Sequence, residues 1–254
     1  MNLLNPGTAH YALRTLLLLL PLALHAQVDT PKPTYMGREI AQTMHYSGAS
    51  WLIRHKRERE EASEKMREEL RLKPGMDVCD MGSGNGYHTI PMAKAVAPGG
   101  KAYAVDIQKP MLEMLEAAAR RAEVANIVPI LGTQDDPKLP DASCDLVLLV
   151  DVYHEFSQPK EMLAKMKQAL KPHGQIVLVE FRSEDDDVPI KPEHKMSKAQ
   201  VMKEMTAGGM VLARSFDGLP WQHMMFFEAG QPASPSIQTT TPSPTPTSTP
   251  TSKP

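Results

Sequence analysis

Short apolar runs alternate with helix-like segments through most of this chain, and that alternation restricts the possible folds more than any other feature. The runs, which are typical of buried parallel strands, are residues 76–81, 101–106, 127–131, 145–150 and 175–181. Between them, apolar side chains recur at helical spacing at Met111, Leu115, Ala118 and Ala122, and again at Met162, Met166 and Leu170. Repeated strand–helix–strand units predict an α/β fold, a doubly wound sheet with helices on both faces.

The end of this pattern differs from its beginning. After a helix expected at residues 197–207, the apolar runs 210–216 and 223–228 are separated only by DGLPWQ. A link that short favours an antiparallel hairpin over another crossover connection. The last strand is therefore expected to run against the others.

Residues 27–73, which precede the sheet, form a separate predicted region. Prolines and glycines make residues 27–49 irregular. Residues 50–72 are dense in charge, with apolar side chains at four-residue spacing at Ala62, Met66 and Leu70. Arg57 and Glu61 lie one helical turn apart, and such a pair adds a small stabilisation to a helix. We expect an N-terminal helical extension, a mostly solvated helix with a thin apolar seam, as a candidate cap over a substrate.

Residues 1–26 resemble a secretory signal peptide. An apolar run at residues 16–24 is followed by a small residue, Ala26, before Gln27, which predicts cleavage after Ala26. The run is shorter than the roughly 20 apolar residues that a membrane span needs. An uncleaved leader is the alternative, and it would be the only expected contact with a membrane. We predict export to the periplasm or the outside, with a cytoplasmic location as the alternative if the leader is not used.

Composition argues against several other classes of protein. The chain has 254 residues, with 28 basic against 30 acidic side chains, so no charge bias indicates a nucleic-acid partner. Its two cysteines, Cys79 and Cys144, lie in apolar runs and are expected to be small buried side chains rather than a disulfide framework. The nine histidines show no convincing ligand spacing, so no metal is predicted. Residues 231–254 hold almost nothing apolar and are predicted to be disordered.

The first expected strand leads into a glycine-rich turn, in the segment VCDMGSGNGYHT at residues 78–89. Ligands of doubly wound sheets bind beyond the carboxyl ends of the strands, and glycine there lets the backbone turn sharply and approach a ligand closely. Tyr87 breaks the dinucleotide fingerprint G-x-G-x-x-G/A, and the chain has no G-K-[ST] for a triphosphate. The turn suits a nucleotide-like ligand that need not carry a pyrophosphate.

Acidic residues follow the first three expected strands. Asp106, 20 residues past Gly86, can accept hydrogen bonds from both hydroxyls of a ribose. Asp135 and Asp136 follow the third strand, where a carboxylate can accept from the amine of an adenine or simply form a surface turn. Asp80 either holds an ammonium group of the ligand or caps the turn.

The chain resembles the class I S-adenosylmethionine-dependent methyltransferases in an ordered series of segments: VCDMGSGNGYHTIPMA, AYAVDIQKPMLEML, ILGTQDDPKLP, CDLVLLVDVYHEF and LKPHGQIVLVEF. The resemblance covers residues 74–228 and places a methyltransferase domain at residues 74–230. It implies a Rossmann-like, seven-stranded sheet, mostly parallel with the last strand antiparallel. It also implies S-adenosyl-L-methionine as the cofactor.

The resemblance implies roles for particular cofactor-binding residues. The turn that would pass beneath the methionine part and ribose of the cofactor consists of Gly82, Ser83, Gly84, Asn85 and Gly86. Asp80 would help to hold the amino group, Asp106 would bind the ribose, and Ile107 would lie against the adenine face. Either Asp135 or Asp136 would meet the adenine edge.

The segment after the fourth strand is where the family brings the methyl acceptor to the cofactor. It reads Asp151-Val152-Tyr153-His154, which departs from the [NDS]-P-P-[YF] motif of the base-amine methyltransferases and disfavours nucleobases as acceptors. Asp151 would lie beside the cofactor. His154 is the candidate base for an acceptor that loses a proton, and Tyr153 would orient the acceptor through its hydroxyl. As an alternative, His154 only hydrogen-bonds backbone.

Two segments outside the core motifs are rich in aromatic, His and Met side chains, residues 44–55 and 219–228. The side chains there that would close over a substrate, unless they belong to the core, are Tyr46, Trp51, Trp221 and His223. Residues 182–197 are a candidate lid or a solvated acidic loop. We expect a methyltransferase that transfers a methyl group from S-adenosylmethionine to a small molecule by in-line displacement. Arsenic is disfavoured as the acceptor, because that chemistry depends on several cysteines. An exported adenosyl-binding or scaffold protein without catalysis is the alternative.

Overall fold

A seven-stranded sheet forms the centre of the fold in the computed structural model, which describes residues 32–230. The strands follow one another across the sheet in the order β5-β4-β3-β6-β7-β9-β8. Their bounds are β3 (Val78–Met81), β4 (Ala102–Asp106), β5 (Ile127–Leu131), β6 (Cys144–Val150), β7 (Leu170–Phe181), β8 (Met210–Phe216) and β9 (Gln222–Ala229). Only β9 runs against its neighbours, β7 and β8, while the pairs from β5 to β7 are parallel. The predicted α/β class and the reversed last strand are confirmed.

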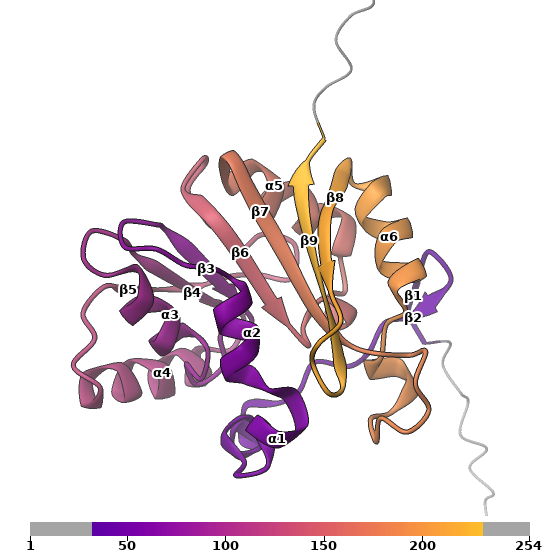
Figure 1. Ribbon diagram of the computed structural model, residues 1–254, viewed down its shortest axis with the longest axis horizontal. Coiled ribbons are helices and arrows are strands. Elements are labelled where there is room, and N and C mark those ends of the chain that lie inside the picture. The colour runs from indigo at the N-terminus through magenta and orange to yellow at the C-terminus, as the bar shows by residue number, and fades with distance from the viewer. Residues whose placement is uncertain (1–31, 231–254) are drawn as a thin grey trace, which may run out of the picture. The chain divides into compact units, whose positions relative to one another are not determined.

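The two faces of the sheet are covered because alternate side chains of each strand point to opposite sides. In β6, Val147 and Leu149 pack with helices α5 (Pro159–Ala169) and α6 (Lys198–Ala207) on one face. Leu146 and Leu148 pack with α2 (Ser63–Glu69) and α3 (Thr89–Val96) on the other. Helix α4 (Lys109–Arg121) packs against β4 and β5 (Figure 1). Both cysteines are fully buried and free, as expected.

The N-terminal extension differs from the single charged helix expected at residues 50–72. It contains a small hairpin, β1 (Thr34–Tyr35) with β2 (Arg38–Glu39), then the 3-10 helix η1 (Tyr46–Ile53), α1 (Arg57–Glu61) and α2. Ala62 adopts a left-handed conformation, with φ of 48°, and separates α1 from α2. The helix breaks there because its two parts are buried against different neighbours: Met66 joins the sheet core, while Arg57 lies against His88.

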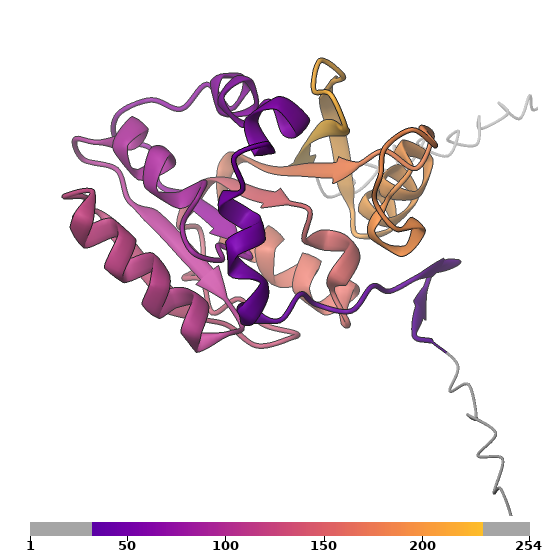
Figure 2. The same ribbon diagram turned by 90° about the horizontal axis from the view of Figure 1, so that it is seen from below.

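The extension crosses the side of the sheet where the parallel strands end (Figure 2). This is the side on which a doubly wound sheet binds its ligands, because the chain passes from β3 to β4 and β5 on one side of β3 and then crosses back to β6 on its other side. No helix within residues 32–230 is both long and apolar enough to cross a membrane. The predicted signal peptide and the predicted disordered tail lie outside the described residues.

Candidate active site

A cavity of about 1350 Å³ lies between the extension and the carboxyl ends of the central strands. The sheet contributes the residues after β3, β4 and β6, among them Gly82, Asp106 and Asp151. The extension contributes residues from Lys32 to Glu61, and the loop after β7 contributes residues from Pro189 to His194. Three parts of the chain that are distant in sequence therefore enclose one space.

The glycine turn has the conformation that only glycine adopts without strain. The φ angles are 72° at Gly82, 52° at Gly84 and 90° at Gly86. A Cβ on Gly84 would lie 2.6 Å from a methyl of Leu52 in η1, and one on Gly82 would lie 2.5 Å from Val152. The backbone of the turn thus packs closely against both the extension and the segment after β6, and a side chain at either glycine would prevent that approach.

Asp106 organises this turn from the end of β4. One carboxylate oxygen accepts the backbone N–H of Gly84 at 2.9 Å, and the other accepts that of Gln108 at 2.8 Å. Burial raises the pKa of Asp106, while these two backbone N–H groups oppose the rise. Asp106 and the half-exposed Ile107 both line the cavity, in keeping with their predicted places beside a ribose and an adenine.

Gln108 joins the extension to the sheet. Its side chain donates to the carbonyl of Met44 at 2.9 Å and accepts the N–H of Tyr46 at 2.8 Å. Asn85 adds a second link, since its amide donates to the carbonyl of Ala49 at 3.0 Å. These hydrogen bonds hold residues 44–49 over the cavity, so the extension takes the place predicted for a cap.

Several buried polar atoms around the turn have no hydrogen-bond partner among residues 32–230. They are Ser83 Oγ, Asn85 Oδ1 and Asp151 Oδ1. Unpaired buried polar atoms are costly unless a ligand or water satisfies them. Asp80 is different, because it is buried behind the turn and accepts the Thr89 hydroxyl at 2.5 Å. Burial raises the pKa of Asp80 to about 6, and the Thr89 hydrogen bond opposes that rise.

The predicted acidic pair after β5 lies away from the cavity lining. Asp135 is exposed and accepts the Thr133 hydroxyl at 2.7 Å, and Asp136 accepts the N–H of Lys138 at 2.7 Å. These contacts are those of a surface turn. The residues of this turn that line the cavity are Thr133 and Gln134.

Asp151 follows β6 in a strained conformation, with φ of 53°. One of its carboxylate oxygens accepts the side-chain amide of Gln222 at 2.7 Å, and the other is the unpaired Oδ1. Burial, with Glu61 and Glu180 nearby, raises the pKa of Asp151 well above its usual range. Asp151 and Gly82 both line the cavity.

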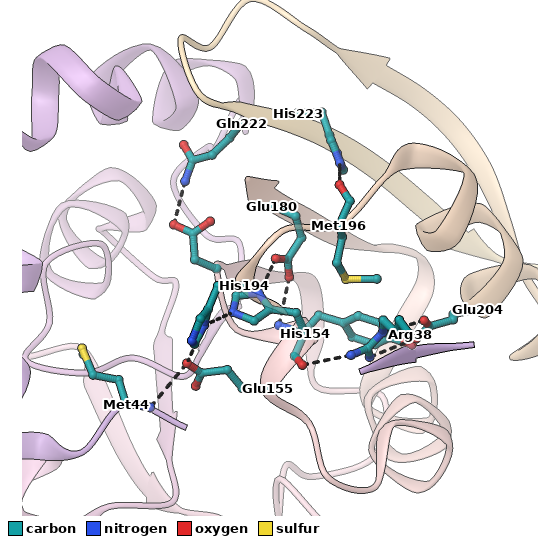
Figure 3. A network of polar contacts seen from close by, with 12 residues as sticks. Arg38, Met44, His154, Glu155, Glu180, His194, Met196, Glu204, Gln222 and His223 are labelled. Atoms are coloured by element: carbon teal, nitrogen blue, oxygen red, sulfur yellow. Dashed lines mark hydrogen bonds and ion pairs between the residues drawn. The ribbon is translucent and has the colours of Figure 1, made fainter. Parts of the chain in front are cut away.

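His154 belongs to a buried polar cluster at the same end of the cavity (Figure 3). Its Nδ1 lies 2.6 Å from the carboxylate of Glu180, and its Nε2 lies 3.1 Å from Nδ1 of His194. Burial disfavours the charged imidazole, but the Glu180 carboxylate outweighs burial and raises the pKa of His154. Burial raises the pKa of Glu155 to about 7, although His154 opposes this. Burial and His154 both lower the pKa of His194.

Residues in and just after the β1–β2 hairpin of the extension hold this cluster in place. Arg38 donates to the backbone carbonyl of His154 at 2.9 Å and forms an ion pair with the buried Glu204 at 2.7 Å. The backbone N–H of Ala41 donates to the same carbonyl of His154 at 3.2 Å. The extension therefore positions the end of the cavity at His154 as well as the glycine turn.

The remaining predicted residues are divided between the cavity and the core. Trp51 lines the cavity, half-exposed, with the Arg54 guanidinium 3.8 Å from its ring centroid. Three others are not part of the lining: Tyr153, which is fully buried against Phe156, His223, whose Nε2 donates to the carbonyl of Met196, and Trp221, which packs near Phe181. Tyr46 contributes its backbone N–H to Gln108 while its ring is exposed.

Sequence reasoning missed three residues of the cluster at His154. Glu180 had a recognisable signal, because a carboxylate inside the apolar run 175–181 is rarely buried without a partner. Glu155 directly follows the candidate base His154 in the sequence, and that adjacency was a usable signal. His194 lies in an irregular loop, and nothing in its local sequence distinguishes it.

This fold, with a glycine turn and an acid at the tips of neighbouring parallel strands, defines a nucleoside-binding α/β domain. A family model described as "Methyltransferase domain" matches residues 72–229. The chain belongs to this family, the class I S-adenosylmethionine-dependent methyltransferases, whose cofactor is S-adenosyl-L-methionine.

Curated relatives match only parts of the chain. Nocamycin O-methyltransferase of Saccharothrix syringae is 32% identical over 106 residues, 42% of this chain and 38% of that protein. Demethylmenaquinone methyltransferase of Geobacillus sp. (strain WCH70) is 30% identical over 139 residues, 54% of this chain and 58% of that protein. The chain thus covers less than two thirds of either relative. A solved S-adenosylmethionine-dependent methyltransferase from Aquifex aeolicus has the same fold, with a TM-score of 0.69 at 24% identity over 73% of this chain and 98% of that chain.

The residues of the cavity fit the cofactor of the family. Gly82 and Gly84 line the cavity without side chains of their own, and Asp106 stands at the end of the neighbouring strand. Asp151, which lines the cavity, keeps one buried carboxylate oxygen without a protein partner among the described residues. Ser83 and Asn85 also keep such an atom in the glycine turn, although their side chains are not part of the lining. A ligand with amine, hydroxyl and carboxylate groups would satisfy such atoms.

Proposed function

We propose that this protein transfers a methyl group from S-adenosyl-L-methionine to a small-molecule acceptor bound in the same cavity. The observation that carries the proposal is that one cavity is lined both by the glycine turn with Asp106 and by the polar cluster at His154. The names of the two relatives, one an O-methyltransferase and one a demethylmenaquinone methyltransferase, support a small acceptor.

The cofactor supplies an electrophilic methyl group on a sulfonium, so the protein has to hold the acceptor in line and keep water away. Gly82 to Gly86 and Asp106 are proposed to hold the cofactor's methionine and ribose parts, with Asp80 near the amino group. Ile107, Thr133 and Gln134 would surround the adenine. The extension excludes solvent, since Leu52 packs directly over Gly84.

The acceptor is proposed to lie against His154, Glu155 and His194. An acceptor hydroxyl has to lose its proton, and this cluster offers two imidazoles and a carboxylate on the cavity wall. Little of the His154 side chain is exposed, whereas 28% of the His194 side chain is. A proton from the acceptor would therefore first meet His194 or Glu155, with His154 and Glu180 behind them.

The test of this proposal has two stages. Calorimetry should detect binding of S-adenosylhomocysteine to the purified protein. Hydroxylated small molecules, including quinols, should then be screened for release of S-adenosylhomocysteine from S-adenosylmethionine. Binding without turnover by any acceptor would favour an adenosyl-binding protein without catalysis, and failure to bind either compound would contradict the proposal.

Replacement of Gly84 by alanine should weaken S-adenosylhomocysteine binding about tenfold. The new Cβ would meet Leu52 at 2.6 Å and would have to tolerate a φ of 52°, a strain of about 1–3 kcal/mol. Gly75→Ala is the matched control, because its φ is 88° but nothing lies within 4 Å of its Cβ. Calorimetry on both variants should find reduced affinity only for Gly84→Ala. Equal affinities of the two variants for S-adenosylhomocysteine would mean that the glycine turn is not part of the binding site.

Affinity for S-adenosylhomocysteine should fall as the pH drops through about 6. Asp80 has a pKa of about 6, raised by burial, so it is a carboxylate above that pH and a neutral acid below it. Only the carboxylate attracts the ligand's ammonium group, and affinity should approach a tenfold loss for each pH unit below the pKa. Titrations between pH 5 and 8 would measure this step. Asp80→Asn should bind weakly throughout and lack the step, and a step that persists in this variant would assign it to another group.

A further inference from the structure

Three side chains at the acceptor end of the cavity converge from two separate 3-10 turns. His154 and Glu155 lie on η2 (Tyr153–Glu155), and His194 ends η3 (Pro192–His194). Each offers one atom able to bind a metal, and these atoms lie within 4.8 Å of one another. Figure 3 shows the imidazole rings of His154 and His194 next to each other above the Glu155 carboxylate, with their planes at 85° to each other. The spacing of histidines along the chain gave no hint of this cluster, because 40 residues separate its two imidazoles.

The distances between these atoms are close to those around a tetrahedral ion. Ligand atoms about 2.0–2.1 Å from a zinc ion lie about 3.3–3.4 Å apart. Nε2 of His154 is 3.1 Å from Nδ1 of His194, and that atom is 3.9 Å from Oε1 of Glu155. These two separations lie on either side of the required value, and the third pair, His154 with Glu155, lies within 4.8 Å. Small side-chain movements would therefore bring the three atoms around one ion.

Glu180 prepares His154 to act as a ligand. A carboxylate only accepts hydrogen bonds, so the 2.6 Å contact places the proton of His154 on Nδ1 and leaves a lone pair on Nε2. A carboxylate behind a histidine in this way is the usual support of a metal-binding imidazole. Glu180 is itself fully buried and accepts the backbone N–H of Tyr153 at 3.0 Å, which fixes its orientation.

The lone pair on His154 needs a partner. Without an ion, Nε2 of His154 accepts a hydrogen bond from the Nδ1–H of His194 at 3.1 Å. With an ion, both nitrogens act as ligands and Glu155 adds a charged oxygen. All three residues line the cavity, so an ion held by them would keep at least one position open toward the acceptor. Three protein ligands with an open position are the arrangement of catalytic rather than structural zinc sites.

We propose that His154, Glu155 and His194 bind a divalent transition-metal ion, which takes an oxygen of the methyl acceptor as its next ligand. This inference rests on the proposed function and narrows the acceptor to hydroxylated small molecules, such as phenols or enols. The ion would lower the pKa of a bound hydroxyl, whose O–H bond then breaks and releases its proton to water. With the ion bound, His194 and Glu155 act as its ligands, and they are the first acceptors of that proton only when the ion is absent. Two nitrogens and one carboxylate favour zinc, cobalt, nickel or iron over magnesium or calcium.

Calorimetry with Zn²⁺ on chelator-treated full-length protein tests the inference directly. One ion should bind per chain, and Co²⁺ should give the visible absorption of a low-symmetry nitrogen and oxygen site. His194→Ala should lower the affinity for Zn²⁺ at least about tenfold, and Glu180→Gln should lower it about 10–100-fold through the orientation of His154. His173→Asn is the matched control, since His173 is exposed on the far end of β7 and should leave Zn²⁺ binding unchanged.

Two results would overturn the inference. One is the absence of Zn²⁺ and Co²⁺ binding to a protein that still binds S-adenosylhomocysteine. The other is an affinity for Zn²⁺ that His194→Ala leaves unchanged. S-adenosylhomocysteine affinity of each variant, expected at the wild-type value, verifies that the fold is intact. Methyl transfer that survives chelation would contradict the role of the ion while leaving the proposed function in place.

Discussion

Glu180→Gln should lower kcat for methyl transfer about 1000-fold while leaving the affinity for S-adenosylhomocysteine unchanged. Glutamine has nearly the shape of glutamate, so its oxygen can still accept the N–H of Tyr153, which the carboxylate holds at 3.0 Å. Its amide nitrogen would then face Nδ1 of His154. A donor in that position forces the proton of His154 onto Nε2, which points it at His194. Loss of a positioned proton acceptor typically costs about 10²–10⁴-fold in rate.

Glu180→Gln also distinguishes a loss of His154 positioning from a general loss of structure. Glu180 does not line the cavity, so it acts through His154 and its loss should change kcat rather than the binding of cofactor. Glu228→Gln is the matched control, because Glu228 accepts the Gln175 amide at 2.7 Å at the opposite end of the sheet. Steady-state kinetics and calorimetry on both variants give the comparison. A loss of kcat below tenfold in Glu180→Gln would mean that the tautomer of His154 is unimportant for the reaction.

The parts of the site that lie on regular elements could be predicted from the sequence. Buried parallel strands have a strong pattern, and the residue that ends each strand must lie at the ligand-binding edge. That logic placed Asp106 at the ligand-binding edge, and the resemblance to the methyltransferases gave Asp151 its expected place; the structure has both residues on the cavity wall. The same logic also placed the glycine turn, whose positive φ angles are a property of the backbone that only glycine satisfies easily.

The parts that depend on how distant segments pack could not be predicted. Glu180 reaches His154 because β7 pairs with β6 in a register that sets Val179 beside Val150, and a register of this kind does not follow from an apolar pattern alone. His194 reaches the cluster because its loop is tied to the end of β7, through the backbone of Met196 and Phe181. The break at Ala62 likewise reflects burial of Arg57, which local helix propensity does not register.

Aromatic and histidine content misidentified part of the acceptor pocket for a related reason. His223 and Trp221 lie on or next to β9, the strand inserted between β7 and β8, and the lining of the cavity does not include either side chain. A polar side chain in a central strand can bond a backbone carbonyl, as Nε2 of His223 does with Met196, while its buried Nδ1 has no partner among the described residues. Composition alone does not distinguish such a residue from one that faces a substrate.

Asp106→Ala should weaken S-adenosylhomocysteine binding about 10²–10³-fold. The proposed contacts with two ribose hydroxyls would be lost, and hydrogen bonds to a charged group contribute about 1.5–3 kcal/mol each. The substitution also leaves the N–H groups of Gly84 and Gln108 without their acceptor, so the glycine turn and the link to the extension lose support together. Calorimetry would measure the affinity, and thermal unfolding would measure the stability.

Asp135→Asn is the informative control for that result. The sequence predicts that Asp106 and Asp135 both lie beside the adenosyl group, but in the structure only Asp106 lines the cavity. Asp135 is exposed and already accepts the Thr133 hydroxyl, so its substitution should change the affinity for S-adenosylhomocysteine less than about threefold. A large effect at Asp135 would mean that the turn after β5 rearranges when the cofactor binds, with Asp135 replacing Gln134 at the adenine edge. An affinity unchanged in Asp106→Ala would instead contradict the cofactor site as a whole, since no other carboxylate holds the glycine turn by its backbone within residues 32–230.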